Sequence, residues 1–255
     1  YSPTMPFSMI KALMSLINLT ALSSSLSMGG PAFVGGRYLS STDNFLKAPF
    51  RFPCVIVEAD SSEHEEEVEW ETCEHLFQAM KFDSINGGTK TWNHCRKIQE
   101  VQGAMEAWSL GQSRKCPLRK DWEKMKGHAM YLAVKAKYDQ YPEYDSELVN
   151  TTAPIKAKRS TSNWQELNSI VLERVRFELS MVSSSKVDES SLEYKSWCRA
   201  TSLSTKSNPV TVYLFPASAA AVEKPVAKKR RRWKLCSKGL DEMLRSFRSI
   251  ISRCY

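Results

Sequence analysis

The sequence lacks the cysteine and histidine spacings that build metal sites and disulfide frameworks. It contains four histidines, and its seven cysteines are scattered over positions 54, 73, 95, 116, 198, 236 and 254. No two cysteines form a close pair, and none has a histidine partner at the spacing of a zinc site. We therefore expect no metal and no cofactor. An odd number of scattered cysteines also favours reduced thiols in an intracellular protein.

Long hydrophobic runs and internal repeats are absent too. The apolar run within residues 5–30 is too short to span a bilayer, so we expect no transmembrane segment. This stretch resembles a secretory signal, but its basic region is thin and no small-residue cleavage motif follows it. A disordered or amphipathic leader over residues 1–30 is the favoured interpretation, and a signal peptide is the alternative.

Most of the chain has little net charge. The overall charge is +8, yet residues 224–255 alone hold eleven basic and two acidic residues, which leaves −1 for the rest. The run KKRRRWK, from Lys228 to Lys234, is typical of nuclear import signals and nucleic-acid contacts. The apolar spacing over 240–251 adds a basic amphipathic helix, suited to an anionic membrane or a partner groove. For the isolated run, a solvated, disordered tail is the favoured interpretation, and the expected location is cytoplasmic or nuclear.

Hydrophobic patterning is concentrated in residues 31–180, which we predict to be a single domain. The Ser-rich, charged residues 181–223 have the composition of a linker. The predicted strands are 48–52, which ends at a turn at Pro53, and 67–72, with an acidic loop at 61–67 between them. The predicted helices are 73–83, 94–109, 122–139 with Asp121 as its cap, and 164–179. The sum is a mainly α domain with a small antiparallel sheet, of the α+β class.

The helix at 73–83 carries an unusual polar stripe. Glu74, Gln78 and Lys81 follow each other at i, i+4 and i+7, which places them on one face. On spacing alone, a solvated helix face is the favoured interpretation. Two neighbouring features argue against it, because Phe77 and Phe82 leave the helix few directions toward water, and because the helix directly follows a strand.

The wording of this segment resembles the signature of the NADAR family, the YbiA-like N-glycosidases. The matching stretches are TCEHLFQAMKF (72–82), STDNFLKAPFRF (41–52), LGQSRKCPLRKDW (110–122) and MYLAVKAKYDQYPEYDSELVNT (130–151). They occur in order over about 120 residues, from 36 to 155, with Asp43 where the family usually has Ser. An ordered set of this length is a far stronger signal than a single motif.

The resemblance implies a YbiA-like, mainly helical domain that hydrolyses N-glycosidic bonds. The implied substrates are phosphoribosyl-linked intermediates of riboflavin synthesis, or ADP-ribose attached to guanine in nucleic acid. Glu74 is the expected catalytic residue, because a fixed carboxylate can stabilise a developing oxocarbenium ion and activate water. The expected substrate-binding residues are Asn44, Gln78, Lys81, Arg114, Arg119 and Trp122. A core position is the equal alternative for the tryptophan.

The resemblance weakens after residue 155. Lys156 stands where an acidic residue is expected, Thr161 where Asp is expected, and Gln165 where Gly is expected. A lysine pointing into the site would oppose a developing cation, which would leave a module that binds phosphoribosyl or ADP-ribosyl ligands without hydrolysing them. If the loop has moved instead, Glu166 or Asp145 would take the acidic role.

Overall fold

The computed structural model describes residues 29–183, 191–202 and 210–217. The strands are β1 Ala32–Val34, β2 Arg37–Leu39, β3 Phe50–Val57, β4 Glu63–Trp70 and β5 Tyr213–Leu214. The α-helices are α2 Cys73–Ala79, α3 Gly88–Glu100, α4 Ala104–Gly111, α5 Trp122–Tyr138, α6 Pro142–Val149, α7 Ser162–Ser183 and α8 Leu192–Thr201. A short 3-10 helix, η1, covers Ser40–Thr42. The predicted leader (apart from residues 29 and 30) and the basic tail lie outside the described residues.

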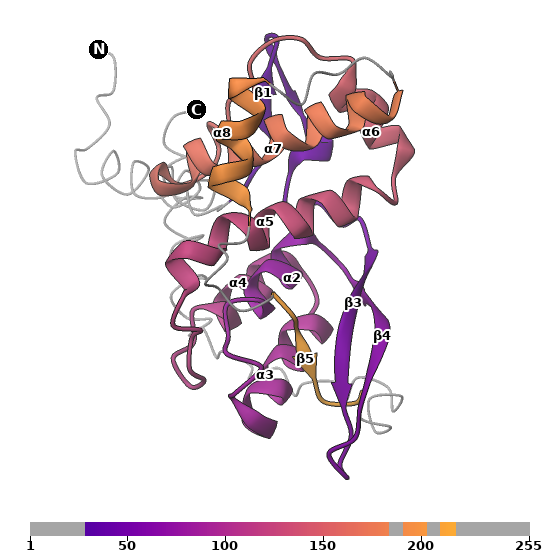
Figure 1. The fold of residues 1–255 in the computed structure, drawn as a ribbon, viewed down its shortest axis with the longest axis vertical. Helices are drawn as coiled ribbons and strands as arrows, with labels where there is room; N and C mark the ends of the chain where they lie inside the picture. Colours follow the sequence, from indigo (N-terminus) through magenta and orange to yellow (C-terminus); the bar gives the residue numbers. More distant parts are fainter. Residues whose placement is uncertain (1–28, 184–190, 203–209, 218–255) are drawn as a thin grey trace, which may run out of the picture. The chain divides into compact units, whose positions relative to one another are not determined.

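The predicted fold class is confirmed, since helices dominate and the sheets are small (Figure 1). β1 and β2 form an antiparallel hairpin, and β3 pairs with β4 from Phe50↔Trp70 to Val57↔Glu63. The larger sheet differs from the prediction because it is mixed: β5 joins β3 in parallel. A two-residue strand reached across more than 150 residues leaves no periodic signal in the sequence.

The acidic segment is a strand and not the predicted loop. β4 begins at Glu63, and its acidic side chains face solvent while Val68 and Trp70 face inward as predicted. β4 is the edge of its sheet, a place where charge discourages further strand pairing. β3 also continues through Pro53, where a turn was predicted. The N–H of Val55 bonds to Val212, so the nitrogen of Pro53 faces the same edge, before β5 begins.

Two helical boundaries differ from the prediction. The expected helix at 94–109 is divided into α3 and α4, because Gly103 adopts a φ of 87° between them. α6, which was not among the predicted helices, has Pro142 in its first turn. Asp121 does not cap α5 through its side chain, which forms an ion pair with Arg119 instead.

The segment expected to be a linker carries ordered structure. α8 packs against α5 and α7, and β5 packs against β3 and α3. These elements extend the fold beyond residue 180. All the described elements fall in one compact unit that ends at Pro216.

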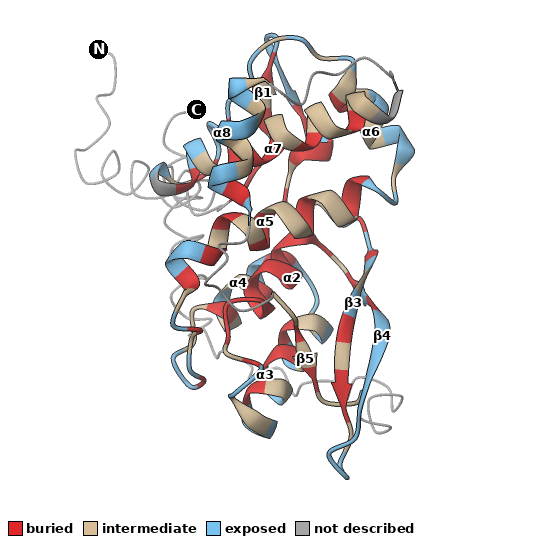
Figure 2. Ribbon diagram, viewed as in Figure 1, coloured by how far each residue is buried: buried red, intermediate tan, exposed pale blue. Residues whose placement is uncertain are grey.

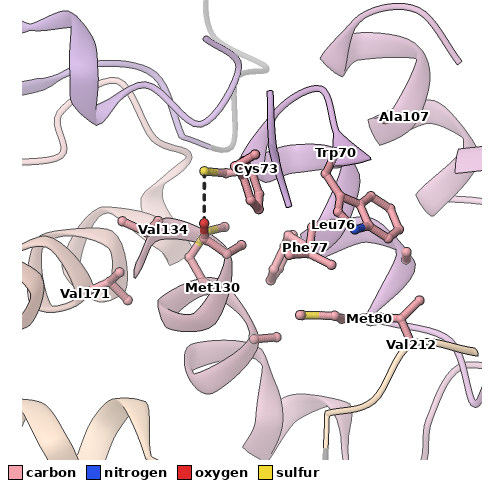
Figure 3. Packing of buried hydrophobic residues seen from close by; sticks show 14 of the residues in the cluster. Trp70, Cys73, Leu76, Phe77, Met80, Ala107, Met130, Val134, Val171 and Val212 are labelled. Atoms are coloured by element: carbon pink, nitrogen blue, oxygen red, sulfur yellow. Dashed lines mark hydrogen bonds between the residues drawn. The ribbon is translucent and has the colours of Figure 1, made fainter. Parts of the chain in front are cut away.

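α2 is central to the fold and is buried along its whole length (Figure 2). It contacts α3, α4, α5 and β4 (Figure 1), and its Phe77 ring also lies 5.1 Å from that of Trp164 on α7. Its apolar residues Cys73, Leu76, Phe77 and Met80 pack into the core beside Met130 of α5 (Figure 3). A short helix enclosed in this way holds its polar side chains in a rigid, low-dielectric setting. In the described part of the chain, no helix has the length and apolar character needed to cross a membrane.

Candidate active site

The first turn of α2 is fixed by its cap and by the loop before β3. Thr72 has extended backbone, and its hydroxyl oxygen lies 2.8 Å from His75 Nδ1 and 3.4 Å from His75 N. The backbone N–H of Glu74 donates to the carbonyl of Asn44 at 3.1 Å. These bonds satisfy amides that have no partner within the helix. The Glu74 side chain therefore begins from an immobile backbone.

The polar stripe forms one continuous hydrogen-bonded chain. Gln78 Nε2 donates to Glu74 Oε1 at 2.5 Å, and Lys81 Nζ donates to Gln78 Oε1 at 3.0 Å. The ammonium also donates to the carbonyl of Gly111, at the end of α4, at 2.9 Å. Glu74 and Gln78 are 0% exposed and Lys81 is 6% exposed, which excludes a solvated helix face. The structure therefore brings the three stripe residues together.

The two ionisable residues of this hydrogen-bonded row, Glu74 and Lys81, have shifted pKa values. Burial raises the pKa of Glu74 from 4.5 to about 7, while the Gln78 hydrogen bond and the Lys81 charge oppose the rise. Burial lowers the pKa of Lys81 from 10.5 to about 8; the Glu74 charge opposes this shift and the Arg114 charge adds to it. Within the described part of the chain, Glu74 Oε2 is buried without a hydrogen-bond partner. One carboxyl oxygen is thus fixed, and the other remains open to chemistry.

Asn44 lies beside Glu74 and is buried. Its side-chain N–H donates to the sulfur of Met130 at 3.2 Å, a weak acceptor that a ligand oxygen could replace. The loop before it is held by the buried ammonium of Lys137, which donates to the carbonyls of Ser41 at 2.6 Å and Asp43 at 3.2 Å. Asn44 is thereby placed as firmly as the carboxyl next to it.

A glycine packs against each of the two candidate amides. A Cβ on Gly111 would lie 1.9 Å from Gln78 Oε1, and a Cβ on Gly29 would lie 2.3 Å from Asn44 Nδ2. Both distances are well below van der Waals contact. Neither glycine was predicted from the sequence to have a role. For Gly111, the available signal was the Leu-Gly pair within the matched segment at 110–122.

The other three expected binding residues lie around the stripe in different settings. Arg114 is exposed and donates to the carbonyl of Gln112 at 3.1 Å. Arg119 is buried, forms an ion pair with Asp121 at 2.7 Å and lines a separate cleft of about 490 Å³. Trp122 is 9% exposed, and its ring centroid lies 5.2 Å from that of Phe77. This geometry favours the core interpretation of the tryptophan.

The residues that depart from the family pattern are not part of the hydrogen-bonded row of Glu74, Gln78 and Lys81. Lys156 is exposed, and its backbone pairs with Phe33 through hydrogen bonds of 2.8 and 3.0 Å. The charges that act on Glu74 are those of Lys81 and Asp43, and Lys156 is not among them. The orientation that would have placed an ammonium next to the reacting centre is therefore not observed.

The remaining departures and stand-ins also lie outside the stripe. Thr161 is half-buried before the first turn of α7, and the exposed Gln165 donates to the carbonyl of Ser160 at 3.1 Å. Glu166 is exposed, and Asp145 lies on α6, where it lines a cleft with Lys135 and Asp139. Neither is among the charges that act on Glu74, so neither takes the acidic role expected at position 156.

The chemistry that the described side chains offer at this site is proton transfer. No group of three or more His, Cys, Asp or Glu in these parts of the chain is arranged to hold a metal ion. The five described cysteines, Cys54, Cys73, Cys95, Cys116 and Cys198, are free thiols. Burial raises the pKa of Cys73, which makes it a core residue and a poor nucleophile. A carboxyl that titrates near neutral pH, by contrast, can both accept and return a proton.

Part of the chain matches a known domain family. The NADAR domain family matches residues 40–165, a range that includes the whole Glu74–Gln78–Lys81 chain and the Asn44 loop. Residues 40–165 form a NADAR domain. The NADAR signature thus coincides with the most deeply buried polar side chains of the fold.

Named relatives share this domain. The N-glycosidases YbiA of Escherichia coli (strain K12) and Shigella boydii serotype 4 are each 37% identical over 94 residues, or 37% of this chain and 54% of theirs. The chain thus spans about half the length of these relatives. The riboflavin biosynthesis protein PYRR, chloroplastic, of Zea mays is 30% identical over 95 residues, 36% of this chain and 15% of its own.

A solved structure also resembles the NADAR protein. The NMR structure of E. coli YbiA is 23% identical and covers 60% of this chain and 89% of its own, with a TM-score of 0.41.

Proposed function

We propose that the NADAR domain is an N-glycosidase that hydrolyses the bond between the anomeric carbon of a ribosyl group and a nitrogen. One observation carries the proposal: Glu74 is fully buried, has a pKa raised to about 7, and has one fixed and one unpartnered oxygen. A carboxyl tuned to neutral pH is the group that glycosidic hydrolysis needs. The names of the YbiA relatives support the same reaction class.

In the proposed reaction, water replaces nitrogen at the anomeric carbon. The carbon–nitrogen bond breaks with its electron pair moving to nitrogen, and the sugar passes through an oxocarbenium-like state. Ionised Glu74 stabilises this cation and takes a proton from the attacking water through Oε2. The protonated carboxyl then returns that proton to the leaving nitrogen. The products are a sugar with a free hydroxyl and an N–H compound, so atoms and charge balance.

The neighbouring residues have separate tasks in this proposal. Asn44 offers its weakly engaged amide N–H to a ribose hydroxyl. Arg114, exposed and close enough to lower the pKa of Lys81, binds the phosphate of the substrate. A phosphoribosyl compound is the preferred substrate class, supported by the PYRR relative, and an ADP-ribosyl group on guanine is the second. Because Glu74 is fully covered, the side chains around it must move when a substrate binds.

Release of the sugar phosphate tests the proposal. The full chain is incubated with a 5-phosphoribosyl aminopyrimidine and, separately, with DNA that carries ADP-ribosylated guanine. We expect release of ribose 5-phosphate or ADP-ribose that is lost in Glu74→Gln. The matched control is Glu69→Gln, which neutralises an exposed carboxylate on β4 and retains release.

Two outcomes would contradict the proposal. Equal release by the wild type and Glu74→Gln would place the chemistry elsewhere. A folded wild-type protein that binds ribose 5-phosphate and releases nothing from either substrate would be a binding module, the alternative that the departures after residue 155 raise.

A further inference from the structure

A basic and aromatic surface lies on the β1–β2 hairpin and the segment that follows Ile155. We call it the hairpin patch and define it by Phe33, Tyr38, Lys156, Lys158 and Arg159. Phe33 pairs with Tyr38 across the hairpin, and their ring centroids are 5.3 Å apart. On its other side Phe33 is bridged to Lys156. Directly opposed residues of antiparallel strands point to the same face, so Lys156, Phe33 and Tyr38 form a row.

Two more cations are stacked on the rings of this row. Lys158 Nζ lies 4.3 Å from the centroid of Phe33, and Arg159 Cζ lies 4.2 Å from the centroid of Tyr38. These are cation–π distances, and they hold the two charges at the surface in defined positions. Lys156, Lys158 and Arg159 are all exposed, and Tyr38 is 44% exposed. The patch therefore presents three positive charges on an aromatic support.

The patch borders the loop that carries Asn44. Ala157, between Lys156 and Lys158, lines a small internal cavity together with Asn44. Arg159 is also close enough to Asp43 to act on its ionisation. A ligand that lies along the patch would thus run past the candidate active site.

We propose that the hairpin patch binds the phosphate backbone of a single-stranded nucleic acid. Its cations are spread along a surface row and do not converge in a pocket, which suits a chain of phosphates better than one small anion. The row crosses three chain segments, about 10 Å, which is the scale of a single strand. Arginine and aromatic planes also accept stacked bases without sequence preference.

Other polyanions fit these observations less well. An anionic membrane is typically bound by a cluster of four to eight basic residues next to inserted apolar side chains. A cation lies over one face of each ring, Phe33 and Tyr38, which does not suit insertion into acyl chains. The proposal is independent of the chemistry at Glu74, because it concerns the binding of an unmodified strand.

The test measures binding of a fluorescein-labelled single-stranded DNA 15-mer by anisotropy over a series of salt concentrations. The full chain is used, in a background in which the basic run is neutralised by Lys228→Gln, Lys229→Gln, Arg230→Gln, Arg231→Gln and Arg232→Gln. The patch variant carries Lys156→Ala, Lys158→Ala and Arg159→Ala. Each lost phosphate contact lowers the slope of log K against log salt by about 0.7, so we expect a fall of about 2.

The matched control removes the same charge elsewhere. Lys90→Ala, Lys97→Ala and Lys124→Ala lie on exposed positions of α3 and α5 and should leave the slope unchanged. Tyr38→Ala, which removes the support of Arg159, should weaken binding about two- to fivefold. Glu74→Gln should bind the strand like the background protein, so a failure of the glycosidase proposal leaves this test intact.

Three results would overturn the proposal. The first is the same slope in the patch variant and the control. The second is binding to vesicles of phosphatidylserine and phosphatidylcholine that the patch variant loses, without binding to the oligonucleotide. The third is complete displacement of the strand by pyrophosphate at constant ionic strength, which would indicate a site for a small anion. Circular dichroism of each variant confirms that the fold is retained.

Discussion

Gln78 holds Glu74 by a 2.5 Å hydrogen bond from its amide nitrogen to Oε1. Its amide oxygen accepts from Lys81, so the orientation of the amide is fixed from both ends. A side chain with both polar atoms engaged and no exposure is poorly placed to bind a ligand. We therefore regard Gln78 as a positioning residue for Glu74 and not as the substrate-binding residue that the family resemblance implied.

Gln78→Leu should shift the pH dependence of hydrolysis. The Gln78 hydrogen bond lowers the pKa of Glu74, so its removal raises that pKa above about 7. If ionised Glu74 is the active form, the acidic limb of kcat/KM moves to higher pH, while KM for the sugar phosphate changes little. A pH–rate series on the wild type, Gln78→Leu and the exposed control Gln102→Leu checks this. An unmoved acidic limb would contradict the role of the amide.

Glu74→Gln should make the protein more resistant to heat at alkaline pH. The folded-state pKa of Glu74 is raised, so its contribution to stability is complete below about 4.5 and is lost as pH rises through about 7. A neutral glutamine does not suffer this loss. Thermal melts should give the variant the higher Tm at pH 8, with the difference between variant and wild type shrinking toward pH 5. A difference that does not vary with pH would show that Glu74 is not buried as an acid.

Gly111→Ala should disrupt the hydrogen bonds that join Glu74, Gln78 and Lys81, although it changes no polar side chain. The added methyl would lie 1.9 Å from Gln78 Oε1, so the amide must move away from Glu74 and Lys81. We expect a loss of about 1–3 kcal/mol in the free energy of unfolding from overpacking, and at least a tenfold fall in kcat. Ser109→Ala, at an exposed position of α4 two residues earlier, is the control. Urea unfolding and initial rates provide the two measurements, and wild-type values in both would refute the close approach.

Trp122→Ala should act on stability more than on binding. The indole packs against Phe77 in the core, and removing a buried Trp costs about 3–5 kcal/mol. Trp122→Phe keeps an aromatic ring and should retain most of the stability and the wild-type KM. Urea unfolding and substrate titration separate the effects. If Trp122→Phe stays stable but its KM rises strongly, the indole contacts the substrate after all.

The sequence predicted the elements whose periodicity is local. α2 and α5 follow apolar repeats of three and four residues, and the inward positions Val68 and Trp70 alternate as a strand requires. It did not predict the division at Gly103, because a single glycine is tolerated within many helices. The pairing of β5 with β3 was not predicted for a different reason, since the two strands are remote in sequence.

The candidate site was predictable only in part. The stripe spacing placed Glu74, Gln78 and Lys81 on one face. Whether such a face is exposed to solvent depends on elements that are distant in the sequence, such as α4. Arg119 illustrates the converse case, because its ion pair with Asp121 is a local contact that the helix-cap prediction overlooked. The outward direction of Lys156 depends on its pairing with Phe33, more than 120 residues earlier.

The parallel pairing of β5 with β3 has a consequence for how this protein is made. Val55 and Ile56 pair with Tyr213 and Leu214, so this part of the sheet cannot form until the chain has been synthesised beyond residue 214. Contacts of such long sequence separation slow folding, because a large loop must be closed before they form. A nascent chain stopped at residue 165, where the family match ends, would contain Glu74 and Gln78 but not β5. Synthesis of β5 thus completes a sheet in a domain whose candidate catalytic residue, Glu74, lies more than a hundred residues earlier in the chain.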